Sequence, residues 1–339
     1  MVRPVVVPLP AHTRRIYCRG SDKSALKAGL IAIGLQFIRS AWPVKQFARS
    51  LAVRTVSSGW PLLPLSVSRA LLGVARLGVS KPVEAPGGRA VGCMSIDFDA
   101  TEGRLELNRR GTRVLVELSM RHGFPMTWAI CGKTAEEDPL SYQMVRGCEV
   151  SQEVAVHTYS HIDVSRCTED ELALEVDRCI SVLGLKEKPR TFIFPWNKEG
   201  HLEALRRMGF TAYRGEARGI GRPAKTTGLW NIRPVHYLSK SSYGLSSYVT
   251  RLMDLCVSTR SVFHIWLHPW SVVGPNPEAY QVSVLEPVFS YMARLRDAGA
   301  MDIMTMGDLA KGLEAAASSQ GGPYGLGPPA ITPSQLSPV

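Results

Sequence analysis

The chain lacks both a cysteine framework and a hydrophobic run long enough to span a bilayer. Its seven cysteines are scattered without a CxxC pair, which argues against a disulfide scaffold and fits free thiols in a reducing compartment. The apolar run 25–38 contains a lysine and is too short for a membrane helix. The first twenty residues show no hydrophobic core of a secretory signal. The sequence therefore predicts a cytoplasmic protein.

Acidic residues are nearly missing from residues 1–90, which hold 14 Lys and Arg but only two acids. The apolar segments 24–39, 44–56 and 66–77, broken by prolines, predict short helices with basic faces. Such a helical extension either lies on an anionic membrane surface, at its cytoplasmic face, or packs on the main domain with its basic face in solvent. Aromatic residues are sparse there, so no nucleic-acid partner is expected.

From residue 91 onward, short apolar runs alternate with amphipathic stretches. The amphipathic stretches predict helices, one ending at Gly123 and another capped by Thr168 with Glu171. The apolar runs predict strands near 90–99, 124–132, 153–161, 190–196, 210–215, 261–270 and 301–306. This alternation favours a parallel sheet, doubly wound or closed, and we expect a distorted or incomplete (β/α) barrel over 91–314. The Pro-, Gly- and Ser-rich residues 315–339 predict a disordered tail.

Acids and histidines gather where the predicted strands end. Asp97 and Asp99 follow one apolar run, His157 and His161 follow another, and His268 ends a third. Two histidines four apart on a helical turn can reach one metal ion, and two acids two apart on a strand point the same way. One acid can then ligate the metal while the other takes a proton from a water molecule. Their shared position at strand ends supports a catalytic metal site, and solvent-facing pairs without a metal are the alternative.

Four motifs follow one another in the order SIDFDA (95–100), HTYSH (157–161), FIFPWN (192–197) and WLHPW (266–270). Together they resemble the successive motifs of the polysaccharide deacetylase family. The resemblance runs from about Val91 to about Leu313. It implies a distorted (β/α) barrel, a divalent metal that is commonly zinc, and hydrolytic removal of N-acetyl groups from amino sugars.

The resemblance also assigns roles to individual residues. Asp97 resembles the general base and His268 the general acid, while the residues that resemble the metal ligands are Asp99, His157 and His161. Four further residues have two interpretations. They either line a groove on which a sugar ring stacks or belong to a buried aromatic core: Pro195, Trp196, Trp266 and Trp270. We expect His236 and His264 to be packed or surface residues outside the site.

The chain departs from the family pattern in two places. The third motif usually carries an arginine beside the proline, which orients the base, whereas apolar residues stand there in this chain. Arg190 and Arg214 are the candidates to replace it in space. The acid that tunes the catalytic histidine is not evident either, and its candidates are Asp254 and Asp302.

These features predict a metal-dependent N-deacetylase of an amino sugar in a polysaccharide, in a glycolipid or in nucleotide-linked form. A second hypothesis is a hydrolase of another linear amide. A third is a membrane-surface glycan-binding protein that kept the metal but lost turnover, which the missing arginine favours. Retention of both an acid and a base argues against this third hypothesis, because a binder needs neither. The sequence leaves the oligomeric state open.

Overall fold

The computed structural model describes residues 86–99, 103–185, 187–215, 223–239, 242, 246–273 and 280–319. Most of the predicted basic extension and the part of the predicted tail after residue 319 lie outside these residues. Within the described part of the chain, no helix is long and apolar enough to cross a membrane.

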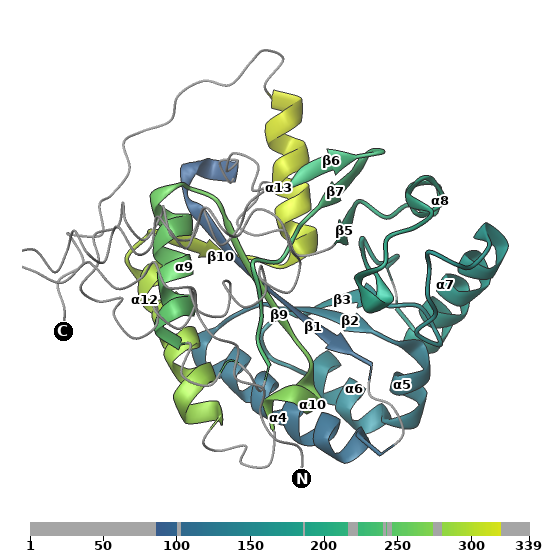
Figure 1. The fold of residues 1–339 in the computed structure, drawn as a ribbon, viewed down its shortest axis with the longest axis horizontal. Helices are drawn as coiled ribbons and strands as arrows, with labels where there is room; N and C mark the ends of the chain where they lie inside the picture. The colour runs from purple at the N-terminus through teal and green to yellow at the C-terminus, as the bar shows by residue number, and fades with distance from the viewer. Residues whose placement is uncertain are drawn as a thin grey trace, which may run out of the picture. The chain divides into compact units, whose positions relative to one another are not determined.

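Ten strands form one sheet in the order β6-β7-β5-β4-β3-β2-β1-β9-β8, and β10 pairs with β1 (Figure 1). The strands are β1 (Ala90–Phe98), β2 (Thr127–Ile130), β3 (Glu153–Val156), β4 (Thr191–Ile193), β5 (Ala212–Arg214), β6 (Ala224–Thr226), β7 (Leu229–Asn231), β8 (His236–Tyr237), β9 (Val262–Leu267) and β10 (Met301–Ile303). The described ladders are parallel except for β6 with β7. Among the described residues no ladder joins β6 to β8, so the sheet is an open barrel and the predicted incomplete (β/α) barrel is confirmed.

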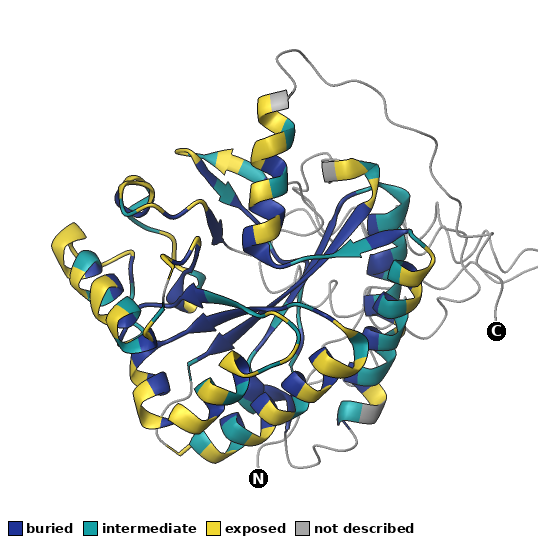
Figure 2. Cartoon of the chain, turned by 180° about the vertical axis from the view of Figure 1, so that it is seen from behind, coloured by how far each residue is buried: buried dark blue, intermediate teal, exposed yellow. Residues whose placement is uncertain are grey.

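Helices flank the sheet, and their buried residues lie mostly on the side that faces it, whereas their exposed residues lie on the outside (Figure 2). They are α4 (Leu105–His122), α5 (Gly132–Glu137), α6 (Pro139–Arg146), α7 (Glu169–Leu183), α8 (Leu202–Arg207), α9 (Ser246–Ser258), α10 (Pro269–Val272), α12 (Glu286–Asp297) and α13 (Met306–Ser319), with the 3₁₀ turns η3 (Pro86–Gly88) and η4 (Pro195–Asn197) and the π-helical turn η6 (Gln281–Leu285). The predicted helix end at Gly123 is confirmed, because this residue has φ 66° and its N–H bonds to the carbonyl of Ser119. The predicted capping box of Thr168 and Glu171 is also present.

Two sequence-based boundaries need correction. Helix α13 continues to Ser319, so residues 315–319 are helical, whereas the sequence assigned them to a disordered tail. The alanines and leucines of this last helix outweigh the two serines at its end, because both have high helix propensity. Strand β3 ends at Val156 rather than at 161, and the segment that carries the histidine pair is a loop.

Alternate residues of β1 face opposite sides of the barrel wall. Ile96 belongs to the large core cluster that the sheet shares with the outer helices. Val91 and Cys93 belong to a second cluster, which combines small residues of the other strands with apolar residues of α13. This second cluster is the floor of the barrel interior. Ser95 and Asp97 continue the inward-facing series above it, and both are buried.

Helix α10 is held against α4 by a contact that only glycine allows. A Cβ on Gly111 would lie 1.9 Å from the carbonyl oxygen of Pro269. Gly111→Ala should therefore lower the free energy of unfolding by about 1–3 kcal/mol through overpacking, although alanine alone would favour the helix by about 1 kcal/mol. Chemical denaturation measures the effect, and Glu117→Ala, at an exposed position of the same helix, should stay within about 0.5 kcal/mol of the parent. Equal stability of the parent and Gly111→Ala would contradict the tight packing.

Candidate active site

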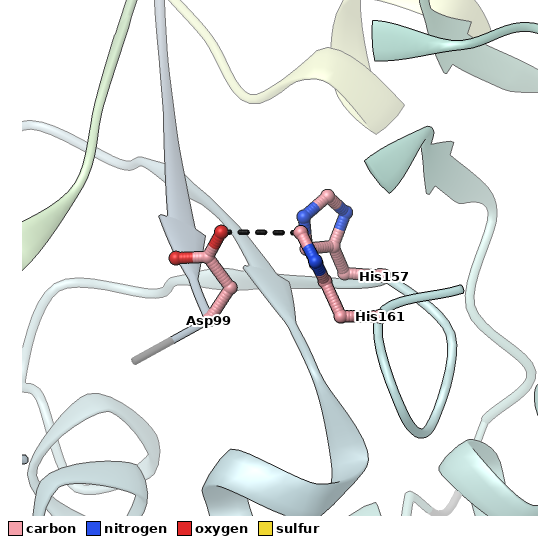
Figure 3. A group of neighbouring side chains, drawn as sticks. All are labelled: Asp99, His157 and His161. Atoms are coloured by element: carbon pink, nitrogen blue, oxygen red, sulfur yellow. Dashed lines mark ion pairs between the residues drawn. The ribbon is translucent and has the colours of Figure 1, made fainter. Parts of the chain in front are cut away.

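Three potential metal ligands converge at the carboxyl ends of β1 and β3 (Figure 3). One ligand atom from each of Asp99, His157 and His161 lies within 4.8 Å of the other two. Nε2 of His161 is 3.2 Å from Oδ2 of Asp99. Carboxyl ends of parallel strands are where barrel folds gather their reactive groups. The predicted ligand set is thus brought together by the fold.

The ring of His157 is oriented like that of a metal-ligating histidine. Its Nδ1 lies 2.7 Å from the backbone carbonyl of Ile193 and must donate the proton there, because a carbonyl only accepts. The other nitrogen, Nε2, is buried and has no hydrogen-bond partner in the described part of the chain. Burial lowers the pKa of His157 to about 4, so Nε2 carries a free lone pair at neutral pH. A backbone-anchored imidazole with a free, inward lone pair is the arrangement that metal sites use.

The two histidines approach each other through a loop and not through the helical turn that the spacing predicts. Thr158 and His161 both have a left-handed φ of 59°, which a regular helix does not contain. The imidazole centroids are 4.9 Å apart. Positive φ is costly for a β-branched residue such as threonine, so the surrounding contacts hold this loop in its shape.

Asp97 forms a bidentate salt bridge with Arg214 of β5. Its two carboxylate oxygens lie 2.6 Å from Nη1 and 2.5 Å from Nη2, and the arginine side chain is fully buried. Burial raises the pKa of Asp97, but the charge and hydrogen bonds of Arg214 lower it by more, so the pKa lies below its usual value. Asp97 is therefore a carboxylate at neutral pH with its plane fixed by the guanidinium.

His268 lies between the two acids and a tyrosine. Its Nε2 is 3.4 Å from Oδ2 of Asp99 and 4.0 Å from Oδ2 of Asp97. Its Nδ1 is 3.0 Å from the hydroxyl of Tyr237. Burial raises the pKa of Asp99, but hydrogen bonds from His161 and His268 lower it by more, to well below the usual range. The site thus combines two carboxylates with a histidine that can carry a proton between them and a substrate.

Residues 89–213 match the family model described as polysaccharide deacetylase. This stretch belongs to the polysaccharide deacetylase family. It contains the two acids, the histidine pair and the third motif, whereas Arg214 and His268 lie beyond its end. No curated protein sequence matches the chain.

Solved structures agree with this fold. A protein from Mycobacterium smegmatis that is assigned as a polysaccharide deacetylase is 17% identical, with 75% of this chain and 99% of that chain covered and a TM-score of 0.55. Puue allantoinase is 13% identical, with 72% of this chain and 96% of that chain covered and a TM-score of 0.51. At these identities the likeness concerns the fold alone.

The structure accounts for the arginine that the deacetylase motif lacks. Ile193 of β4 pairs in register with Arg214 of β5, so the guanidinium enters the interior one strand further along the sheet. Arg190, the other candidate, is exposed. The sequence alone could name Arg214 but could not choose it, because the choice depends on strand register.

Neither acid suggested for tuning His268 contacts it, and this expectation is wrong. Asp254 binds Tyr291 and Arg251, and Asp302 pairs with Arg89 3.0 Å away. The hydroxyl of Tyr237 lies at Nδ1 of His268 instead. Tyr237 belongs to the two-residue strand β8, which no sequence pattern predicted.

Three tryptophans lie beside the acids, the histidines or Arg214 of this candidate site, and Pro195 precedes one of them. Trp270 donates its indole N–H to Asp99 at 3.2 Å and stacks on His268 with a centroid distance of 4.4 Å. Trp266 lies under the guanidinium of Arg214, 4.4 Å from its Cζ. Pro195 is buried and begins η4, whereas Trp196 is 65% exposed. Of the predicted groove residues, Trp196 is therefore the one most open to a sugar ring.

Proposed function

We propose that this chain is a metal-dependent hydrolase that removes N-acetyl groups from an amino sugar. Family membership of residues 89–213 supports carbohydrate deacetylase activity. The observation that carries the finer proposal is the meeting of Asp97, Asp99 and His268 with the histidine pair at one end of the barrel. A base, an acid and a metal-ligand set within one site fit hydrolysis of an amide.

Asp99, His157 and His161 would hold the metal, and the buried, unpartnered Nε2 of His157 supports this assignment. One carboxylate and two imidazoles with space for water is a ligand set that zinc accepts in catalytic sites. When bound, such an ion polarises the amide carbonyl and makes a water molecule more acidic.

Asp97 acts as the base in the proposed reaction. Held as a carboxylate by Arg214, it accepts a proton from the water that attacks the acetamide carbon. His268, within 4.0 Å of Asp97, gives a proton to the sugar nitrogen as the C–N bond breaks, so that the amine does not leave as an anion. Acetate and the free amino sugar are the products. The hydroxyl of Tyr237 at Nδ1 fixes the ring plane of His268.

Trp196 supports a sugar as the substrate. The residue is 65% exposed, and its ring centroid lies 4.8 Å from that of His161. An exposed aromatic face beside the ligands gives an apolar surface on which the C–H face of a hexosamine can stack.

The basic residues 1–90 carry 14 Lys and Arg against two acids. We propose that they bind an anionic membrane surface on the cytoplasmic side, where the sugar would be linked to a lipid or a nucleotide.

A glycan binder without turnover is the alternative from another class. Its main support was the missing arginine, and Arg214 now supplies that contact to Asp97. A hydrolase of another linear amide would use the same groups, so only the identity of its substrate distinguishes it from the proposed deacetylase.

Acetate release from a panel of substrates tests the proposal. Metal-loaded full-length protein is given N-acetylhexosamines in free, nucleotide-linked and lipid-linked form, together with non-sugar acetamides. We expect release from at least one sugar, and no release above background from Asp97→Asn. Release only from non-sugar amides would assign the alternative hydrolase. No release from any compound, with one metal bound per chain, would favour the binder.

A further inference from the structure

A chain of buried polar groups lies in the barrel interior below Asp97. Ser95, Arg214 and His264 are all 0% exposed, and they come from the three strands β1, β5 and β9. Nη1 of Arg214 donates to Oγ of Ser95 at 3.0 Å as well as to Asp97. Oγ of Ser95 lies 2.8 Å from Nε2 of His264. The apolar floor of the interior lies beneath this layer.

The direction of every hydrogen bond in this chain follows from its end groups. Nδ1 of His264 is 3.0 Å from the backbone carbonyl of Ile232, so Nδ1 carries the proton and donates it. Nε2 of the same neutral ring must then accept, and the Ser95 hydroxyl is the donor. The oxygen of Ser95 is left with lone pairs directed at Arg214. Burial and the nearby guanidinium lower the pKa of His264 to about 3, which agrees with a neutral ring.

The plane of Arg214 depends on this oriented oxygen. Nε of Arg214 is buried without a hydrogen-bond partner among the described residues, so within this part of the chain the outer nitrogens fix the guanidinium. Nη2 binds Asp97 and, at 3.3 Å, the side chain of Asn197. Nη1 binds Asp97 and Ser95, and Trp266 covers one face. Without the Ser95 hydroxyl, Asn197 would be the one described hydrogen-bond partner of the guanidinium besides Asp97, and its contact is the longer one. The guanidinium and the Asp97 carboxylate could then rotate together.

We propose that Ser95 and His264 are positioning residues for the base. His264, anchored to Ile232, fixes the hydroxyl rotor of Ser95, and Ser95 fixes the guanidinium of Arg214, which holds the carboxylate of Asp97. Neither residue touches the substrate. Their contribution to rate rests on the proposed deacetylase function, whereas the hydrogen-bond directions do not.

If Ser95, His264 and Arg214 served only the stability of the fold, apolar residues would be expected at these positions. Desolvating a serine, a histidine and a guanidinium is unfavourable, and apolar residues of similar volume often fill such a space with equal or better stability. A polar layer that leads from a backbone carbonyl through three side chains to one carboxylate is expected where orientation of that carboxylate matters.

Ser95→Ala in the full chain tests the proposal. Loss of an orienting hydrogen bond one residue removed from a functional group should lower kcat by about 10- to 100-fold, with KM and bound metal unchanged. Ser95→Thr keeps the hydroxyl and should recover most of kcat. An unchanged kcat in Ser95→Ala would overturn the proposal, and so would a threonine variant that folds, binds metal and remains as slow as alanine.

A second measurement does not depend on turnover. Nitrogen-15 NMR of histidine-labelled full-length protein reports the tautomer of each ring, and His264→Gln identifies the signal of His264. We expect the neutral Nδ1–H tautomer in the parent, and a shifted Nε2 resonance in Ser95→Ala because its donor is gone. An Nε2–H tautomer or an imidazolium in the parent would refute the hydrogen-bond chain. If the parent releases no acetate, the deacetylase proposal fails and this spectrum alone decides the positioning network.

Discussion

Asp97→Asn is expected to lower kcat by about 10²- to 10⁴-fold, the usual contribution of a positioned base, while the metal stays bound. Asparagine keeps the shape of the side chain but cannot accept a proton at neutral pH. The proposed metal ligands are other residues, so metal content measured by elemental analysis should match the parent. A variant that loses metal and activity together would mean that Asp97 is a ligand and not the base.

The same substitution should also destabilise the fold. It removes the charge partner of Arg214, whose side chain is 0% exposed, and breaking a buried pair from one side costs about 3–5 kcal/mol. Asp97→Asn/Arg214→Met removes both charges and should recover part of that stability without recovering turnover. Glu203→Gln, which breaks the exposed pair with Arg206, is the matched control and should change stability by about 0–1 kcal/mol. Stability that does not improve in the double variant would contradict a strongly coupled pair.

The residues that meet in the candidate site could be predicted from the sequence because short motifs carry them. Asp97, Asp99 and the histidine pair each follow an apolar run, and parallel strands bring such positions to one edge whatever the detailed geometry. The local conformation could not be predicted in the same way. The spacing of His157 and His161 fits a helical turn, whereas the chain brings them together with left-handed residues in a loop.

The residues that support the site could not be predicted because they depend on register. Apolar residues stand beside Pro195 where the motif carries an arginine, and only the pairing of β4 with β5 shows that Arg214 is the lateral neighbour of Ile193. Ser95 and His264 read as ordinary strand residues, and their connection requires that β1 and β9 turn these side chains into the same interior. Side-chain partners across a sheet are set by tertiary packing, which local sequence patterns do not encode.

Removal of the metal is the second change with a large expected effect. Exhaustive chelation should abolish acetate release, and zinc should restore it, because Asp99, His157 and His161 offer three ligand atoms within 4.8 Å. Without a bound ion, the lone pairs of the two imidazoles and the negative charge of the Asp99 carboxylate converge with no cation between them. A ligand at 100 times its Kd stabilises the folded state by about 2.7 kcal/mol, so zinc should raise the midpoint of thermal unfolding of the parent.

His157→Ala should remove both the zinc-dependent stabilisation and the activity. Its Nε2 is a buried nitrogen without another partner, so no other described group at that point can replace it as a ligand. His201→Asn is the matched control, because His201 binds the backbone carbonyl of Cys167 outside the cluster and asparagine tolerates its φ of 51°. This control should bind one metal per chain like the parent. Equal metal content and equal zinc stabilisation in His157→Ala would show that the ion is held elsewhere, and the ligand set proposed for this site would then be wrong.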